Sequence, residues 1–415
     1  MSGPKLSHNA TTTESSRLTS NSVMQPDEAE VGRAIASLCE TAAHLAPGAV
    51  SALIRIVCDV VGATDGRLLV ADYGLRRLQQ VDSAGPVGDP QFIEGTLAGR
   101  AFANGEPVLA GSAPTLLWVP LTHGTERIGV LELVFDDRDI ALPDFVKPVI
   151  AVFVLLLITQ SRYSDVWWRA RRSEPLSAAA EAQWDLLPPL ACSTNEVALA
   201  GILEPAYEIG GDSFDYALNG RRLDFVIVDA VGHGMSSVLM SAAAINSVRN
   251  TRREGGDLTT AYQQADQLIR DHFGDCYYVT AQLATLDLTT GSLGWINAGH
   301  VPPLLVRNGT YAGELVCAPS MPIGLGGSVV EVATQKLQSG DRVLFYTDGI
   351  TESRSADASR FGTERLADLL VRSTHDHVPV AETVRRLSAS VVAYVADGLN
   401  DDATLLLIEY RGQSH

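Results

Sequence analysis

One stretch, residues 208–234, constrains the fold more strongly than any other part of the sequence. Two of its aspartates, Asp212 and Asp229, stand beside glycines or at the end of a strand-like run, on either side of residues 223–228. A run of this length that is apolar except for Asp224 predicts a buried strand, which would present Asp229 at its end. The Gly-Gly-Asp sequence at 210–212 predicts a turn where the backbone comes close to a ligand. Two carboxylates presented in this way are typical of a site for Mg²⁺ or Mn²⁺, because these cations prefer oxygen ligands.

The alternative interpretation of this stretch is structural. Turns that contain Gly-Asp, and aspartates at strand ends, are common, and most of them cap helices or close turns. The stretch alone does not decide between a metal site and a structural turn, so the decision depends on carboxylates elsewhere in the chain.

Two later segments repeat the combination of an apolar strand and an aspartate. The predicted strand at 343–346 is followed by Asp348, and a final predicted strand at 405–410 is preceded by Asp401 and Asp402. In an antiparallel sheet the end of one strand lies beside the start of its neighbour, so all these carboxylates can converge at one edge. Clustered carboxylates repel one another unless a cation neutralises them. The pattern therefore favours a hydrolytic site with two metal ions.

Composition and charge exclude some function classes. The chain has 415 residues, enough for two or three domains, with 46% apolar and 19% charged residues as in an ordinary globular protein. Its formal net charge of −18 argues against non-specific binding to nucleic acid, whose phosphates would be repelled. A phosphorylated substrate stays open, because bound cations add local positive charge.

The sequence predicts a cytoplasmic protein with no membrane contact. Its five cysteines form no CxxC pair and fit neither a zinc site nor a disulfide framework, which indicates reduced thiols. Residues 1–27 lack a signal-peptide pattern and are rich in Ser, Thr and Asn, so they predict a disordered tail. The apolar run 149–158 is about half the ~20 residues that span a bilayer, and it predicts a buried helix.

Residues 28–160 are predicted to form one domain of helices and strands. Apolar spacing predicts helices at 29–62 and 143–161 and strands at 67–71, 78–81, 117–121 and 127–135. The motifs GTLAGRAF at 95–102, GEPV at 105–108 and VPL at 119–121 followed by IGVLEL at 128–133 resemble the GAF family of sensory domains, over about residues 32–160. The resemblance implies a pocket for a small ligand or a dimerising regulatory module. A purely structural domain is the alternative.

Residues 161–190 are predicted to form a helical linker and a homodimer contact. A polar, basic helix is expected to continue through 160–172, to be interrupted by Pro175, and to be followed by a helix that Ser177 caps. A helix packed on its own domain is the alternative. Three tryptophans are expected to pack between the two helices: Trp167, Trp168 and Trp184.

Residues 191–412 are predicted to form the second domain, in which five motifs follow one another. They are EIGGDSFD at 208–215, DAVGHG at 229–234, NAGHVPP at 297–303, FYTDGITE at 345–352 and DDAT at 401–404. Together they resemble the metal-dependent protein phosphatase (PPM, type 2C-like) superfamily, in its bacterial SpoIIE/RsbU-like branch, over about residues 180–412. The resemblance implies an α+β fold, an alpha/beta/beta/alpha sandwich of two antiparallel sheets flanked by helices.

The resemblance also implies roles for the aspartates. They would bind two divalent cations, Mn²⁺ or Mg²⁺, with Asp229 as the bridging ligand. Asp402 and Asp215 are weaker candidates for the metal site: they would hydrogen-bond to the ligands or contact a cation through a water molecule. The implied ligands are four carboxylates and one backbone carbonyl: Asp212, Asp229, Asp348, Asp401 and the carbonyl of Ala230.

The implied activity is hydrolysis of phosphoserine or phosphothreonine by a water that the two cations activate, without a phosphoenzyme. His233 is a candidate proton donor to the leaving oxygen, with a structural role as the alternative, and His300 is expected to be structural. Five arginines either steer a phosphoprotein or form a solvated face: Arg221, Arg222, Arg249, Arg252 and Arg253.

The resemblance to the SpoIIE/RsbU-like branch also implies a class of substrate and a cellular process. The substrate would be a phosphorylated anti-sigma-factor antagonist of the STAS type in a bacterial stress response, and the GAF-like domain would regulate its hydrolysis. The alternative is a partner-binding regulatory scaffold with little turnover.

Overall fold

The structure is a computed structural model, and it describes residues 28–44, 49–111, 114–136, 146–204, 207, 210–274, 276–327, 330–395, 399 and 401–412. The predicted tail, residues 1–27, lies outside the described residues, as does Glu208 at the start of the first motif.

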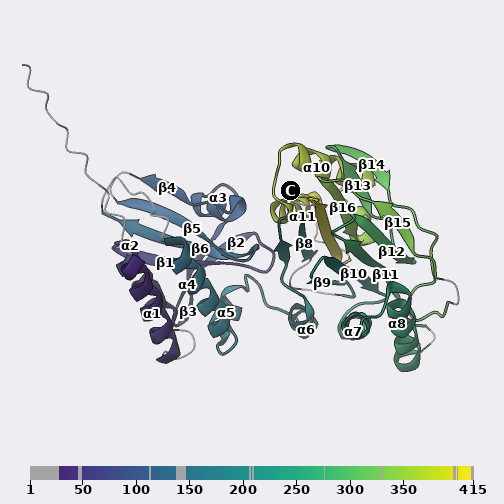
Figure 1. The fold of residues 1–415 in the computed structure, drawn as a ribbon, viewed down its shortest axis with the longest axis horizontal. Coiled ribbons are helices and arrows are strands. Elements are labelled where there is room, and N and C mark those ends of the chain that lie inside the picture. Colours follow the sequence, from purple (N-terminus) through teal and green to yellow (C-terminus); the bar gives the residue numbers. More distant parts are fainter. Residues whose placement is uncertain are drawn as a thin grey trace, which may run out of the picture.

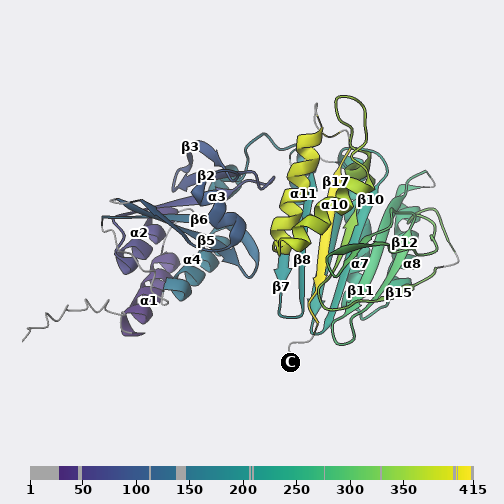
Figure 2. The ribbon, with the colours of Figure 1, turned by 90° about the horizontal axis from the view of Figure 1, so that it is seen from above.

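The N-terminal domain is built on a six-stranded antiparallel sheet in the order β3-β2-β1-β6-β5-β4. Helices α1, α2 and α4 cover one face of this sheet and α3 covers the other (Figures 1 and 2). The strands are β1 Asp65–Ala71, β2 Arg77–Asp82, β3 Gly85–Phe92, β4 Val108–Gly111, β5 Thr115–His123 and β6 Glu126–Phe135. The helices are α1 Glu28–His44, α2 Val50–Val61, α3 Leu97–Asn104 and α4 Val146–Ser161.

The two faces of this sheet are supplied by alternating residues, as the period of a strand requires. In β1, Leu68 and Val70 pack under α1, α2 and α4, while Leu69 and Ala71 pack toward α3. The strands predicted at 67–71, 78–81, 117–121 and 127–135 are confirmed.

The linker between the domains contains two short helices, α5 Asp165–Ala170 and α6 Ala178–Leu186. The prediction of one helix continuing through 160–172 is wrong, because α4 ends at Ser161 and the Ser164 side chain caps a new helix by accepting from Val166 N at 3.3 Å. The cap at Ser177 is confirmed, since its hydroxyl accepts from Ala180 N at 3.0 Å.

The C-terminal domain consists of two antiparallel sheets with helices outside them, which confirms the predicted sandwich (Figures 1 and 2). One sheet has the order β15-β12-β11-β10-β9 and packs against α7 Met235–Arg253 and α8 Leu258–Phe273. Its strands are β9 Ser213–Asn219, β10 Arg222–Ala230, β11 Val279–Asp287, β12 Ser292–Ala298 and β15 Ala333–Lys336.

The second sheet has the order β14-β13-β16-β17-β8-β7 and is covered by α10 Thr363–His375 and α11 Val380–Tyr394. Phe225 and Phe345, from the two sheets, meet edge to face with ring centroids 5.0 Å apart, in the core between the sheets. The strands are β7 Ala191–Ser193, β8 Val197–Glu204, β13 Leu304–Arg307, β14 Thr310–Glu314, β16 Asp341–Tyr346 and β17 Ala403–Tyr410.

The two domains contact each other through the second sheet and its helices. Helix α11 and strands β7 and β8 lie on the side of the C-terminal domain that faces the N-terminal domain (Figure 2). Trp184 of α6 packs against Tyr73 of the N-terminal domain, with ring centroids 4.4 Å apart. Within the part of the chain that the structure describes, no helix is both long enough and apolar enough to cross a membrane.

Candidate metal centre

The first two aspartates lie side by side at the end of the first sheet. Asp212 directly precedes β9, Asp229 is the second-last residue of β10, and the two strands pair in antiparallel register at this end. Gly211 makes the close approach possible, because a Cβ atom at this position would lie 2.1 Å from the carbonyl oxygen of Ala230. The structure therefore explains the glycine at position 211 of the predicted turn: the backbone of the turn lies too close to the backbone of β10 for a side chain to fit between them.

The second sheet supplies the remaining aspartates. Asp348 begins the short helix α9, Asp348–Glu352, directly after β16, and Asp401 and Asp402 directly precede β17. Strands β16 and β17 are antiparallel neighbours, so these residues lie at the same end of the sheet. The structure brings together all five aspartates at this end, as the strand pattern predicted.

Thr347 joins the two sheets at this point. Its buried hydroxyl donates to Asp212 Oδ2 at 2.6 Å and accepts from Thr404 N at 2.8 Å. One hydroxyl therefore fixes an aspartate of the first sheet to β17 of the second.

Asp402 also joins the two sheets, through its carboxylate. The backbone N–H groups of Gly210 and Asp212 donate to its two oxygens at 2.8 and 3.2 Å. A Cβ atom at Gly210 would lie 2.5 Å from Asp402 Oδ2, so a larger residue would have to displace the carboxylate that holds the turn. In this arrangement Asp402 holds the Gly-Gly-Asp turn in place.

The carboxylates raise one another's pKa values. Burial, followed by the charges of Asp229 and Asp402, raises the pKa of Asp212 well above its ordinary value. Burial, followed by the charges of Asp348, Asp401 and Asp402, raises the pKa of Asp229 to about 7. Burial raises the pKa of Asp402 to about 6, and burial with the charge of Asp401 raises that of Asp348. These shifts are those of like charges close together in a partly dry site.

Convergence of the aspartates does not amount to a complete coordination shell. In the described ranges, no three His, Cys, Asp or Glu side chains gather closely enough to hold a metal ion. Asp212 and Asp402 already accept hydrogen bonds from protein donors. The donor chemistry nevertheless fits a hard divalent cation, because the site offers carboxylate oxygens and the nearby carbonyl of Ala230.

Two further side chains hold the backbone of the Gly-Gly-Asp turn. Ser241 of α7 donates to the Gly211 carbonyl, and Gln183 of α6 donates to the Asp212 carbonyl. Both side chains are buried. The sequence did not predict either contact, since each joins a helix to a turn through a backbone acceptor and leaves no local pattern.

The two candidate histidines differ in their surroundings. His300 is buried, and burial lowers its pKa to about 4, so the ring is neutral at physiological pH. Its Nε2 donates to the Tyr346 carbonyl at 3.0 Å, and its Nδ1 therefore accepts from the Thr280 hydroxyl at 2.7 Å. The structural role predicted for His300 is confirmed. His233 lies exposed in the loop before α7, where a role as proton donor remains a prediction.

Asp215 belongs to a separate ion-pair group on the outer side of β9. Arg249 and Arg252 of α7 bind its two oxygens at 2.8 and 2.9 Å. Two other arginines from the predicted set are also in ion pairs, Arg221 with Glu196 and Arg222 with Asp224. These contacts favour structural roles over the steering of a substrate.

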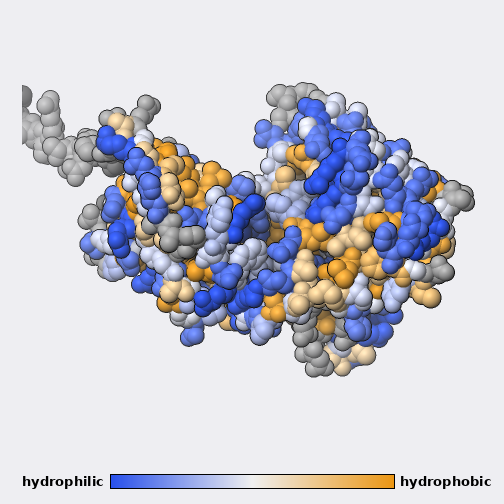
Figure 3. Space-filling view, turned by 90° about the horizontal axis from the view of Figure 1, so that it is seen from below, coloured by the Kyte–Doolittle hydropathy of each residue, from blue (hydrophilic) through white to orange (hydrophobic). Residues whose placement is uncertain are grey.

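Apolar side chains are exposed beside the aspartates. Met235 and Leu239, in the first turns of α7, are 42% and 54% exposed, and only residues 231–234 separate α7 from β10, which carries Asp229. Seen from below, the C-terminal domain displays an apolar area on this side, where α7 and α8 lie (Figure 3). A surface of this kind is typical of a contact with another protein.

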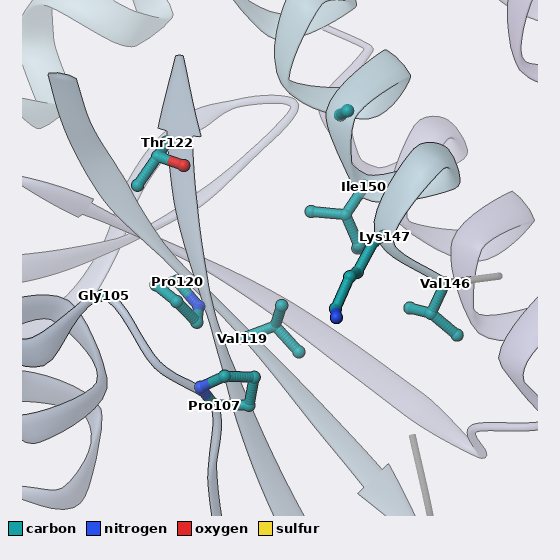
Figure 4. A pocket seen from close by; sticks show the side chains of 9 residues that line it. Gly105, Pro107, Val119, Pro120, Thr122, Val146, Lys147 and Ile150 are labelled. Carbon is teal, nitrogen blue, oxygen red and sulfur yellow. The ribbon is translucent and has the colours of Figure 1, made fainter. Parts of the chain in front are cut away.

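The N-terminal domain contains a cavity of about 330 Å³ between α4 and β5. Its lining includes the apolar side chains of Val119 and Ile150, the hydroxyl of Thr122 and the ammonium of Lys147, which extends from α4 toward β5 (Figure 4). An apolar wall with a few polar groups is typical of a site for a small molecule.

Residues 219–411 match the family model of Stage II sporulation protein E (SpoIIE). Phosphoserine phosphatase RsbP of Bacillus subtilis is 25% identical over 224 residues, which cover 52% of this chain and 53% of that protein. Protein IcfG of Synechocystis sp. is 19% identical over 264 residues, which cover 57% of this chain and 41% of that protein.

Among solved structures, the RsbU and RsbW domains of Rv1364c from Mycobacterium tuberculosis match with 28% identity and a TM-score of 0.46, over 53% of this chain and 63% of that chain.

The chain spans about half the length of the curated relatives named above. The family match contains Asp229, Asp348, Asp401 and Asp402 and begins shortly after Asp212. The C-terminal domain therefore matches the SpoIIE family model over residues that contain four of its five predicted motifs.

Proposed function

We propose that this protein is a metal-dependent phosphatase that hydrolyses phosphoserine or phosphothreonine in a protein substrate. The observation that carries the proposal is the convergence of the five aspartates from two sheets, where burial and neighbouring charges raise the pKa values of Asp212, Asp229, Asp348 and Asp402. The match of residues 219–411 to the SpoIIE family model and the name of the relative RsbP, a phosphoserine phosphatase, support it. The exposed apolar side chains at the start of α7 favour a protein over a small molecule as substrate.

The proposed cofactors are two divalent cations, Mn²⁺ or Mg²⁺. When bound, they would supply an activated water and positive charge for the phosphoryl oxygens. Asp402 is a weaker ligand candidate than the others, because backbone amides already occupy both of its oxygens. The proposed ligands are Asp212, Asp229, Asp348, Asp401 and the carbonyl of Ala230.

The protein itself would orient the ligands and protonate the leaving group. Thr347 holds Asp212 in one rotamer by donating to Oδ2, and Asp402 holds the turn that carries Asp212. The serine or threonine oxygen that leaves phosphorus needs a proton. We assign this transfer to His233, which stands exposed between two glycines.

We further propose that the substrate is a phosphorylated anti-sigma-factor antagonist and that the N-terminal domain regulates its hydrolysis. The SpoIIE/RsbU-like family supports the first part. The GAF-like assignment, the homodimer and the cytoplasmic location remain predictions. A small regulatory ligand would find its best site in the cavity between α4 and β5.

A partner-binding scaffold with little turnover is the second candidate function. The observation that favours it is the lack of a gathered three-ligand group among the described residues. In this case the fold would recognise a partner without hydrolysing it.

Hydrolysis of an aryl phosphate with Mn²⁺ distinguishes the two candidates. Asp229→Asn removes a proposed ligand, so we expect the rate to fall by at least about a hundredfold, in line with the several kcal/mol a metal contributes. The control is Asp224→Asn, a buried aspartate on the same strand that pairs with Arg222, which should keep most of the activity. Equal, negligible rates in the wild type and both variants would support the scaffold instead.

A further inference from the structure

We propose that Glu204 is a positioning residue through which the N-terminal domain controls the aspartates of the metal centre. This inference rests on the proposed function of the site and names the route of its regulation. It comes from three contacts between the domains.

The first contact joins the N-terminal domain to the end of β8. Arg76, in the turn between β1 and β2, forms an ion pair with Glu204 at 2.7 Å. The Glu204 side chain is only 3% exposed, and its Oε1 also accepts from Ser388 of α11 at 2.7 Å. Because an unpaired buried carboxylate is costly, the arginine of the other domain stabilises the charged form of Glu204.

Glu204 lies next to the aspartates in the sheet. It is the last residue of β8, and its register partner on β17 is Ala403, the residue directly after Asp402. Asp402 in turn binds the amides of Gly210 and Asp212. A displacement of Glu204 would therefore move the start of β17 through the β8–β17 pairing. Asp402 would pass this movement on to the Gly-Gly-Asp turn that carries Asp212.

The second contact involves the same turn of the N-terminal domain. Asp72 holds this turn by accepting from the backbone N–H groups of Arg76 and Arg77 at 2.8 and 3.0 Å. Its other oxygen accepts from Ser173 at 2.9 Å, and Ser173 accepts from the Tyr207 hydroxyl at 2.7 Å. Tyr207 stands in the sequence between Glu204 and the Gly-Gly-Asp turn at 210–212, so the same turn of the N-terminal domain is linked to the chain ahead of Asp212 at two residues, Glu204 and Tyr207.

The third contact fixes the N-terminal domain on α11. Arg127 of β6 binds Glu382 at 2.8 Å and donates to the Ala381 carbonyl at 2.9 Å. Both charged side chains are buried, with 9% and 1% exposed. Arg385 of α11 also binds Glu382, at 2.7 Å, and reaches Glu94 of the N-terminal domain at 2.5 Å. This anchor keeps the β1–β2 turn against Glu204.

The first test is hydrogen–deuterium exchange on the full chain without metal, which does not depend on activity. Arg76→Gln removes the partner of Glu204 from a side chain that is 36% exposed, so the fold should persist. We expect exchange at residues 401–404 and 210–212 to become about two- to thirtyfold faster, the range seen for residues that carry coupling. Glu204→Gln should give the same pattern, and the double variant should exchange no faster than the worse single variant.

The control for these variants is Glu409→Gln. Glu409 lies at the other end of β17 and pairs with Arg342 of its own domain at 2.6 Å, so its loss should speed exchange only at that end. Unchanged exchange at 401–404 in Arg76→Gln, or an equal increase there in Glu409→Gln, would overturn the proposal.

The second test is the Mn²⁺ concentration that gives half-maximal hydrolysis of an aryl phosphate. We expect it to rise two- to thirtyfold in Arg76→Gln and Glu204→Gln, with circular dichroism unchanged. A wild type that hydrolyses nothing would count against the proposed function alone, because the exchange experiment still decides the coupling. If the wild type is active but both variants keep its exchange rates and its Mn²⁺ dependence, the proposed coupling between Glu204 and the metal centre is wrong and the proposed function still stands.

Discussion

The carboxyl groups of the metal centre oppose the stability of the fold. The pKa of Asp229 is raised to about 7 and that of Asp402 to about 6, so the folded state disfavours their charged forms. The aspartates therefore lie where they destabilise the fold, a feature that is typical of functional sites.

This conflict gives a prediction for Asp229→Asn in protein treated with a chelator. The folded pKa of about 7 exceeds the ordinary 3.8, so the destabilisation is absent below pH 3.8, grows as pH rises, and is complete above pH 7. At pH 8 the variant should be more stable by up to about 4 kcal/mol, since one pH unit corresponds to about 1.4 kcal/mol. At pH 4 the two proteins should unfold alike.

Urea unfolding of both proteins at pH 4 and pH 8 checks this prediction. The matched control is Asp224→Asn, whose carboxylate already has an arginine partner, Arg222, and which should gain nothing at pH 8. An Asp229→Asn variant no more stable than the wild type at pH 8 would contradict the assigned electrostatics.

At the scale of elements, strand β10 shows why the sequence was informative. Val226 and Val228 face α7, while Phe225 and Ile227 face the other sheet, so both faces are buried and the apolar run is continuous. The aspartates were found because they end or begin such strands.

Other elements were missed for identifiable reasons. Strand β3, Gly85–Phe92, contains two glycines and two prolines, residues that oppose a strand, and it lies at the sheet edge where proline is tolerated. Strand β9 went unpredicted as well. The break between α4 and α5 depends on the hydroxyl of Ser164, which a helical hydrophobic pattern does not reveal.

The hydrogen bonds that hold Asp212 in place could not be predicted from the sequence either. Thr347 contacts Asp212 across 135 residues and Gln183 contacts it across 29. Only the packed fold brings these partners together. Thr347 does stand inside a predicted motif, which was a usable signal, whereas nothing local distinguishes Gln183.

The turn before β9 gives a second prediction, for Gly211→Ala. The added Cβ would lie 2.1 Å from the Ala230 carbonyl oxygen, so the turn or β10 must move. We expect a loss of about 1–3 kcal/mol of stability, as for other overpacked sites, and at least a tenfold loss of Mn²⁺-dependent activity.

Thermal unfolding and aryl phosphate assays check this prediction. Gly294→Ala on β12 is the matched control, because its added Cβ would meet its nearest neighbour at an ordinary 3.6 Å. It should stay within about 0.5 kcal/mol of the wild type. Equal effects of the two substitutions would argue against a special role for Gly211.

At the scale of the whole molecule, the net charge of −18 acts on any anionic substrate. For an acidic phosphopeptide we expect KM to fall severalfold between about 0.01 and 0.15 M salt, because the Debye length shortens from about 30 to about 8 Å. kcat should change little, and a small aryl phosphate should respond less. Initial rates across this salt series measure the effect. A KM that rises with salt would show that local positive charge dominates at the substrate surface.

The position of β17 has a consequence for biosynthesis. This strand lies between β16 and β8, inside its sheet, yet every other strand of both sheets precedes it in the chain. A nascent chain on the ribosome must therefore carry two open strand edges until residues 403–410 emerge from the exit tunnel. Asp401 and Asp402 emerge at the same moment, so the proposed metal centre stays incomplete until this strand has been made, and chaperones have those edges to protect until then.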